Sequence, residues 1–168
     1  RKILILSFLF LSTLAIADKK PPIIDYKSIS HPMIGSKGMV VSQREIASRV
    51  GADILSRGGN AVDAAVATSF ALAVVLPRAG NLGGGGFMLI HLEQEGKTVA
   101  IDYRERAPLS ASRDMFLDSN GNYDKTKARF SLLSAGVPGT VAGMKFALDN
   151  YGSMSWEEVI QPAIDLAV

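Results

Sequence analysis

The sequence predicts an α+β fold, because two helical segments precede a β-hairpin and further helices follow it. The helical segments are Gln43–Arg57 and Asn60–Leu76, and the candidate strands are Phe87–Leu92 and Thr98–Arg104. A short polar turn with a glycine joins the two strands, which is the pattern of an antiparallel hairpin. Mixed segments of this kind, with helices on either side of a hairpin in the chain, are typical of α+β domains.

The first helical segment has signals at both ends. Ser42 and Glu45 have the spacing of a capping box, in which the two side chains satisfy free backbone N–H groups at a helix start. Gly58 stands where a left-handed residue closes a helix. The apolar face has a spacing of four residues and consists of Ile46, Val50 and Ile54.

The second helical segment is apolar around its whole circumference and carries a single charge, Asp63. Such a helix is either a membrane span or a core helix. Its length and the following Pro77 favour the core. Asp63 falls in the first turn, where a carboxylate complements the helix dipole, so we expect a structural role for it.

The first candidate strand is apolar at nearly every position, which predicts burial on both faces. Along the second strand, alternation places Asp102 and Arg104 on one face. Two interpretations of Arg104 remain open from residue type alone. It is either tied in an ion pair to Asp102 or Glu105, or it is a clamp whose paired donors match the two oxygens of a carboxylate.

Four consecutive glycines, Gly83–Gly86, precede the hairpin. Glycine is costly to order, so this run indicates unusual dihedral angles or close packing. A flexible linker is the alternative, but apolar Leu82 and Phe87 flank the run. A nucleotide-binding loop is a second alternative, and it is disfavoured because a strand, not a helix, follows the glycines.

Two more helices are expected near the end of the chain. The first covers about Thr140–Asn150. Ser155 and Glu158 repeat the capping-box spacing before the last helix, in which Trp156 is expected to be a core anchor. Pro162 should end or kink that helix.

Residues 1–17 have the basic start, apolar core and Ala-x-Ala site of a secretory signal peptide. Their apolar stretch is shorter than the ~20 residues that span a bilayer. We therefore expect cleavage after Ala17, a periplasmic or secreted protein, and no membrane span afterwards. The apolar ending at Val168 leads us to expect a truncated domain.

Composition disfavours several classes of function. The net charge is +2, and residues 18–168 are balanced, so no basic footprint for nucleic acid remains. There is no cysteine, and the two histidines are far apart, so we expect no metal site. The turn at Asp118–Asn122 lacks the glycine position and closing glutamate of a calcium loop. No organic cofactor is expected.

Four sequence words, in order and spacing, resemble the start of the gamma-glutamyltranspeptidase (glutathione hydrolase) precursor family, from about Met39 onward. They are Gly58–Ala67, Gly80–Ile90, Asp102–Glu105 and Pro138–Gly143. The resemblance implies an N-terminal-nucleophile hydrolase fold, a four-layer αββα sandwich of which residues 18–168 are only the N-terminal, large-subunit portion. It also implies self-cleavage into two subunits, with the small subunit as partner, and glutathione and other gamma-glutamyl compounds as substrates.

By the same resemblance, Arg104 corresponds to the arginine that binds the alpha-carboxylate of the gamma-glutamyl group. The nucleophilic threonine belongs to the small subunit, so no catalytic residue is expected in this chain. The threonines present do not fit that role: Thr13, Thr68, Thr98, Thr126 and Thr140. Two alternatives are a family member that has become a scaffold and an acylase-type relative acting on another amide.

Overall fold

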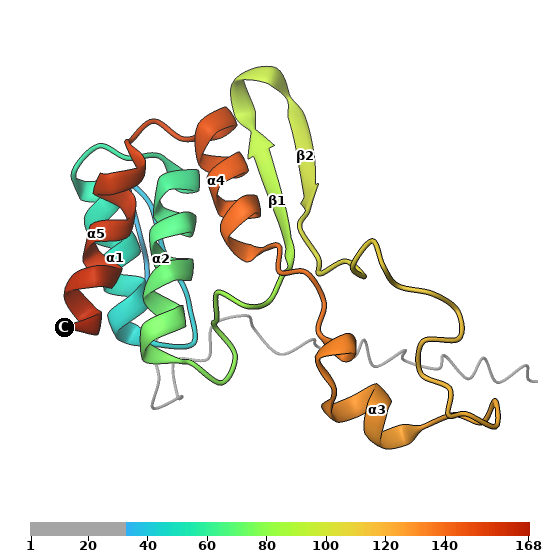
Figure 1. The fold of residues 1–168 in the computed structure, drawn as a ribbon. Helices are drawn as coiled ribbons and strands as arrows, with labels where there is room; N and C mark the ends of the chain where they lie inside the picture. The colour runs from blue at the N-terminus through green and yellow to red at the C-terminus, as the bar shows by residue number, and fades with distance from the viewer. Residues whose placement is uncertain (1–32) are drawn as a thin grey trace, which may run out of the picture. The chain divides into compact units, whose positions relative to one another are not determined.

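The computed structural model describes residues 33–168, so the predicted signal peptide, residues 1–17, lies outside the described part. The helices and strands are α1 (Glu45–Ser56), α2 (Ala61–Val75), β1 (Phe87–Leu92), β2 (Lys97–Asp102), α3 (Lys125–Phe130), α4 (Thr140–Tyr151) and α5 (Trp156–Ala167) (Figure 1). Two 3-10 turns cover Glu93–Glu95 and Leu132–Ser134. All of these belong to one unit, Lys37–Val168.

Helix α2 is the centre of the helical layer. It packs against α1 and α5, and α4 lies between α2 and the hairpin (Figure 1). This position explains why α2 is apolar on all sides, and it confirms the predicted core helix. Its buried residues are Val62, Asp63, Ala64, Val66, Ala67, Thr68 and Ala71. None of the helices between residues 33 and 168 has the length and hydropathy needed to cross a membrane.

The two ends of α1 differ in how well they were predicted. Gly58 has a left-handed φ of 95°, as expected for the residue that closes the helix. The predicted capping box at Ser42 is wrong, because the helix begins at Glu45 with Arg44 as its N-cap. The Ser42 hydroxyl instead donates to the Arg44 carbonyl and lies 2.8 Å from the Ser48 hydroxyl.

The start of α2 is capped by side chains from both members of a capping box. Asn60 Oδ1 accepts hydrogen bonds from the N–H groups of Val62 and Asp63, at 2.8 and 3.1 Å. Asp63 Oδ2 accepts from the N–H of Asn60 at 2.7 Å. The predicted structural role of Asp63 in the first turn is therefore confirmed.

The hairpin pairs β1 with β2 in antiparallel register, and Gly96 closes the turn with a φ of 58°. On its inner face, Ile90 and Ile101 are buried in the core. On its outer face, Phe87 and Leu89 remain 65% and 75% exposed. The expected burial on both faces is thus wrong for the described chain, because its residues supply two strands and cover only one side of them.

The last two helices follow the prediction closely. The Ser155–Glu158 capping box is present, with Ser155 Oγ accepting from the Glu158 N–H at 3.3 Å. The Trp156 ring makes an edge-to-face contact with Phe70 at 5.4 Å between ring centres, as expected of a core anchor. Helix α5 does not end at Pro162 but continues to Ala167, because packing against α2 supports it beyond the missing N–H.

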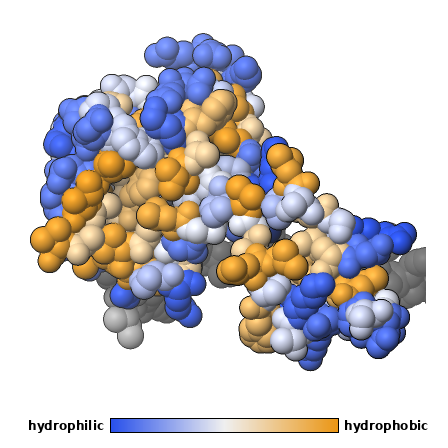
Figure 2. All heavy atoms as spheres, viewed as in Figure 1, coloured by the Kyte–Doolittle hydropathy of each residue, from blue (hydrophilic) through white to orange (hydrophobic). Residues whose placement is uncertain are grey.

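Apolar side chains also reach the surface in two further places (Figure 2). One lies on α5, where Ile164 and Leu166 are 47% and 37% exposed, and the other lies around α3, where Phe130 and Leu132 are exposed.

Candidate functional site

Arg104 lies directly after β2, in a turn that the neighbouring backbone defines. The ladder of the hairpin continues for one more pair, in which Tyr103 N–H donates to Gly86 O at 3.0 Å. Asp102 Oδ1 then accepts from the Arg104 N–H at 2.9 Å. This hydrogen bond closes a turn at the end of β2, and the turn sets the position of the Arg104 backbone.

The Arg104 side chain is 62% exposed. Its Nε donates to Glu105 Oε2 at 3.1 Å, and its Cζ lies 5.9 Å from the centre of the Phe87 ring. Within the described residues, neither Nη atom donates a hydrogen bond to the protein. The ion pair with Glu105 and a clamp function are therefore compatible, because the Nη edge that would meet a carboxylate stays free.

The two carboxylates near Arg104, those of Asp102 and Glu105, bind different parts of the arginine. Asp102 is not its ion-pair partner, since that carboxylate bonds the Arg104 backbone instead. The pKa of Glu105 is lowered by hydrogen bonding from its own backbone N–H and then by the Arg104 side chain. Glu105 therefore stays ionised and fixes the Nε side of the guanidinium.

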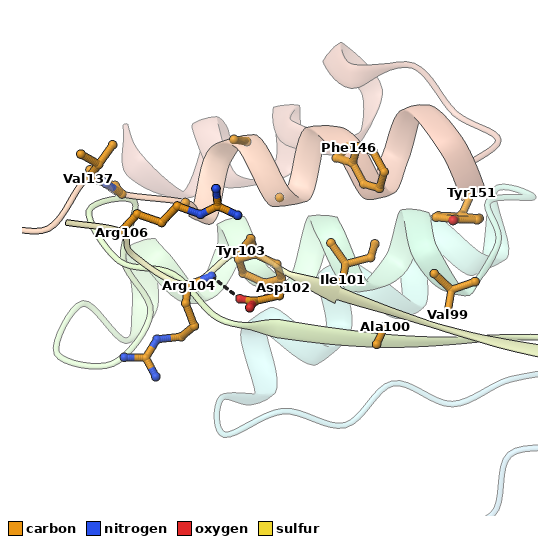
Figure 3. Close-up of a pocket in the computed structure, with 14 residues that line it drawn as sticks. Val99, Ala100, Ile101, Asp102, Tyr103, Arg104, Arg106, Val137, Phe146 and Tyr151 are labelled. Atoms are coloured by element: carbon orange, nitrogen blue, oxygen red, sulfur yellow. Dashed lines mark hydrogen bonds between the residues drawn. The ribbon is translucent and has the colours of Figure 1, made fainter. Parts of the chain in front are cut away.

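A hollow of about 570 Å³ runs between β2 and α4, beside this turn. Its lining includes Ile101, Tyr103, Gly139, Gly143, Phe146 and Tyr151. Figure 3 shows Arg106 on the side of α4, whereas the Arg104 guanidinium points away from that helix. The two arginines consequently face different surroundings.

The glycine run is closely packed and has no left-handed residue among Gly83–Gly86. Gly84 O accepts hydrogen bonds from the N–H groups of Gly139 and Thr140, at 2.8 and 3.0 Å. The run therefore binds the start of α4 and leads straight into β1, so it is not a free linker. The sequence analysis identified both glycine-containing segments, Gly80–Ile90 and Pro138–Gly143, but could not show that they are in contact.

Other candidate residues have ordinary surroundings. His91, on the outer face of β1, contacts the Thr98 hydroxyl at 3.0 Å and Glu93 at 3.1 Å. Among residues 33–168, no three His, Asp or Glu side chains are grouped as metal ligands would be. Asp118 Oδ1 accepts from the N–H groups of Asn120 and Asn122, which makes that segment a closed turn.

The described threonines lie within helices and a strand. Thr68 is buried in α2, Thr98 lies on β2, Thr126 lies in α3 and Thr140 begins α4. Thr13 lies outside the described residues. Arg104 is thus the one predicted site residue, and its free Nη edge suits an anionic ligand.

Comparison with known proteins gives the family. The model of the family described as Gamma-glutamyltranspeptidase matches residues 47–168. The chain belongs to the gamma-glutamyltranspeptidase family. The Glutathione hydrolase proenzyme of Escherichia coli (strain K12) is 54% identical over 156 residues, which cover 91% of this chain and 27% of that protein. The chain therefore spans about a quarter of the length of this gamma-glutamyltranspeptidase relative.

Solved structures agree with this family assignment. The crystal structure of Helicobacter pylori gamma-glutamyltranspeptidase matches with a TM-score of 0.76 and 51% identity, covering 81% of this chain and 39% of that one. Cephalosporin acylase from Bacillus halodurans matches with a TM-score of 0.63 and 25% identity, covering 84% and 27%. The predicted α+β fold, a portion of an N-terminal-nucleophile hydrolase, is confirmed.

Proposed function

We propose that this chain is the N-terminal portion of an exported, self-processing gamma-glutamyltransferase or glutathione hydrolase. Its 54% identity to a protein named glutathione hydrolase proenzyme supports the activity, and the word proenzyme supports processing. The partner would be a small subunit cut from the same precursor. The signal-like residues 1–17 support a periplasmic or secreted location.

The reaction would be acyl transfer from a gamma-glutamyl amide such as glutathione. A threonine hydroxyl, in sequence beyond these residues, attacks the gamma-carbonyl carbon. A C–O bond forms, the C–N bond breaks, and the hydroxyl proton passes to the leaving amine. Water or an amino group of an acceptor then releases the glutamyl group from the threonine.

Arg104 would bind the alpha-carboxylate of the donor. The observation that carries this assignment is the guanidinium geometry, with Nε held by Glu105 and both Nη groups without a hydrogen bond to the described chain. A planar fork of two N–H donors matches the two oxygens of a carboxylate. Binding at this remote group holds the scissile amide at the nucleophile.

The test uses the complete precursor with Arg104→Ala. We expect KM for a gamma-glutamyl anilide to rise about 100-fold, as for the loss of a bidentate charged contact of about 3 kcal/mol. Self-cleavage should proceed. Arg104→Lys should recover little, because an ammonium lacks the fork. Arg113→Ala is the matched control, since Arg113 is 91% exposed and pairs only with Asp114 among the described residues. An unchanged KM for Arg104→Ala would refute the clamp.

A second candidate is an acylase that acts on another amide, which the match to cephalosporin acylase favours. The two candidates differ in what they require of the substrate. A gamma-glutamyltransferase should lose most of its kcat/KM when the donor lacks an alpha-carboxylate, whereas such an acylase should not. A precursor without a threonine at a processing site would point to the scaffold alternative.

A further inference from the structure

Two glycines from distant parts of the chain approach the backbone of the Arg104 turn. A Cβ built on Gly85 would lie 2.5 Å from Tyr103 O, 2.8 Å from Glu105 N and 2.9 Å from Arg104 C. A Cβ built on Gly139 would also overlap Tyr103 O and would lie 3.3 Å from Arg104 O. Real Cβ atoms do not approach the backbone this closely, so both positions require glycine for space.

Hydrogen bonds hold this arrangement in place. Gly84 O, next to Gly85, accepts from the N–H groups of Gly139 and Thr140. On the other side, Gly86 O accepts from Tyr103 N–H at 3.0 Å. The glycine run is therefore bonded to α4 and to the strand at once, and Gly85 cannot move away from the Arg104 turn without breaking these bonds.

The four glycines of the run are not equivalent. A Cβ on Gly83 would meet only Asn81 Oδ1, at 4.0 Å, and Gly83 has no left-handed φ. A Cβ on Gly86 would meet the outer part of the Tyr103 ring, at 3.0 Å. Only Gly85 lies directly against the backbone atoms of residues 103–105.

We propose that Gly85 is a positioning residue, which together with Gly139 fixes the backbone that presents Arg104 to the donor carboxylate. This inference rests on the proposed function of Arg104. A methyl group at position 85 would push the turn by up to about 1 Å, because ordinary contacts of a Cβ begin near 3.4 Å. A displacement of that size at a substrate-positioning group can cost about 100-fold in rate.

The experiment compares Gly85→Ala with Gly83→Ala in the complete precursor. We expect Gly85→Ala to raise KM for a gamma-glutamyl anilide about 10- to 100-fold and Gly83→Ala to leave it within about twofold. The loss should vanish for a matched anilide without the alpha-carboxylate, since that substrate makes no use of Arg104.

A double-mutant cycle separates positioning from general damage. If Gly85 acts through Arg104, adding Gly85→Ala to Arg104→Ala should raise KM no further. The proposal would be overturned if the rises in KM from Gly85→Ala and Arg104→Ala multiplied in the double variant. It would also be overturned if Gly85→Ala raised KM equally for both anilides. If Gly85→Ala does not mature, Gly139→Ala replaces it, because a Cβ there would meet Tyr103 O and Arg104 O of the same turn, and its rise in KM should also disappear in the Arg104→Ala background. An unchanged KM would then overturn the proposal.

The two proposals can fail separately. If Arg104→Ala leaves KM unchanged, the clamp is refuted and the positioning role is refuted with it. If Arg104→Ala raises KM but neither Gly85→Ala nor Gly139→Ala does, only the positioning role is refuted.

Discussion

The Ser153 hydroxyl donates a 2.6 Å hydrogen bond to Asp63 Oδ2, although the two residues are 90 positions apart in the sequence. The same carboxylate accepts from the backbone N–H groups of Ser153 and Met154, at 2.9 and 3.2 Å to Oδ1. Asp63 is fully buried and also caps its own helix. One side chain therefore ties the start of α2 to the connection between α4 and α5.

We predict that Asp63→Asn lowers the free energy of unfolding by about 3 kcal/mol, because an amide nitrogen would face N–H donors and leave them unsatisfied. Urea titration of the purified protein measures this loss. Asp149→Asn is the matched control, since Asp149 is about half-exposed and pairs with Lys145 on the surface, so it should cost less than about 0.5 kcal/mol. Equal losses for the two variants would contradict the buried role.

Acid should weaken the protein through the same group. Burial alone would raise the pKa of Asp63, but hydrogen bonds from Ser153, Asn60 and Met154 outweigh it and hold the pKa below its ordinary value. A group with a lowered folded-state pKa stabilises the fold above its unfolded pKa of about 3.9, and this contribution is lost as the pH falls through the folded value.

The measurement is the free energy of unfolding from pH 7 down to pH 2. Glu105, Asp118 and Glu158 have lowered pKa values as well and act in the same direction. The difference between the wild-type and Asp63→Asn curves isolates Asp63. We expect that difference to be constant above about pH 5 and to shrink below about pH 4; a difference that does not change with pH would show that Asp63 does not titrate in this way.

The two predicted capping serines should differ in their effect on stability. Ser155 accepts the Glu158 N–H, so Ser155→Ala should cost about 1 kcal/mol. Ser42 caps no helix N–H, and Ser42→Ala should cost less than half of that. Thermal unfolding of the two variants tests the pair, and a larger loss for Ser42→Ala would contradict the observed start of α1.

Gly143→Ala should destabilise the protein, although alanine normally favours a helix over glycine by about 1 kcal/mol. Gly143 is buried in α4, and an added Cβ would overlap the Tyr103 ring, so overpacking should cost about 1–3 kcal/mol. Gly83→Ala serves as a comparison, because it adds the same methyl group in open space. A raised melting temperature for Gly143→Ala would show that Tyr103 moves aside without cost.

Local signals made most of the fold predictable. Helix ends followed from Gly58 and Ser155, whose effects act within one turn of the chain, whereas the Asn60 cap of α2 was not predicted. The start of α1 was misjudged because Ser42 prefers a contact with Ser48 across the helix entrance. The burial of β1 was misjudged for a different reason. An apolar run predicts that both faces of a strand are packed, but it does not identify the segments that pack against them.

From the sequence, the site could be predicted only as an arginine within a motif that resembles the family. Arg104 could be selected by resemblance, but its contacts with Glu105 and Phe87 depend on where the turn directs the side chain. The contact of Gly85 with the arginine turn joins segments that are far apart in the chain, and no spacing within one segment reveals it.

The outer face of the hairpin has a consequence for self-association. Phe87 and Leu89 stay in water, and β2 has no partner on its second edge among the described residues. Such a ribbon can recruit another copy by strand pairing while it is uncovered. Described residues that leave this face uncovered should therefore tend to self-associate through the hairpin.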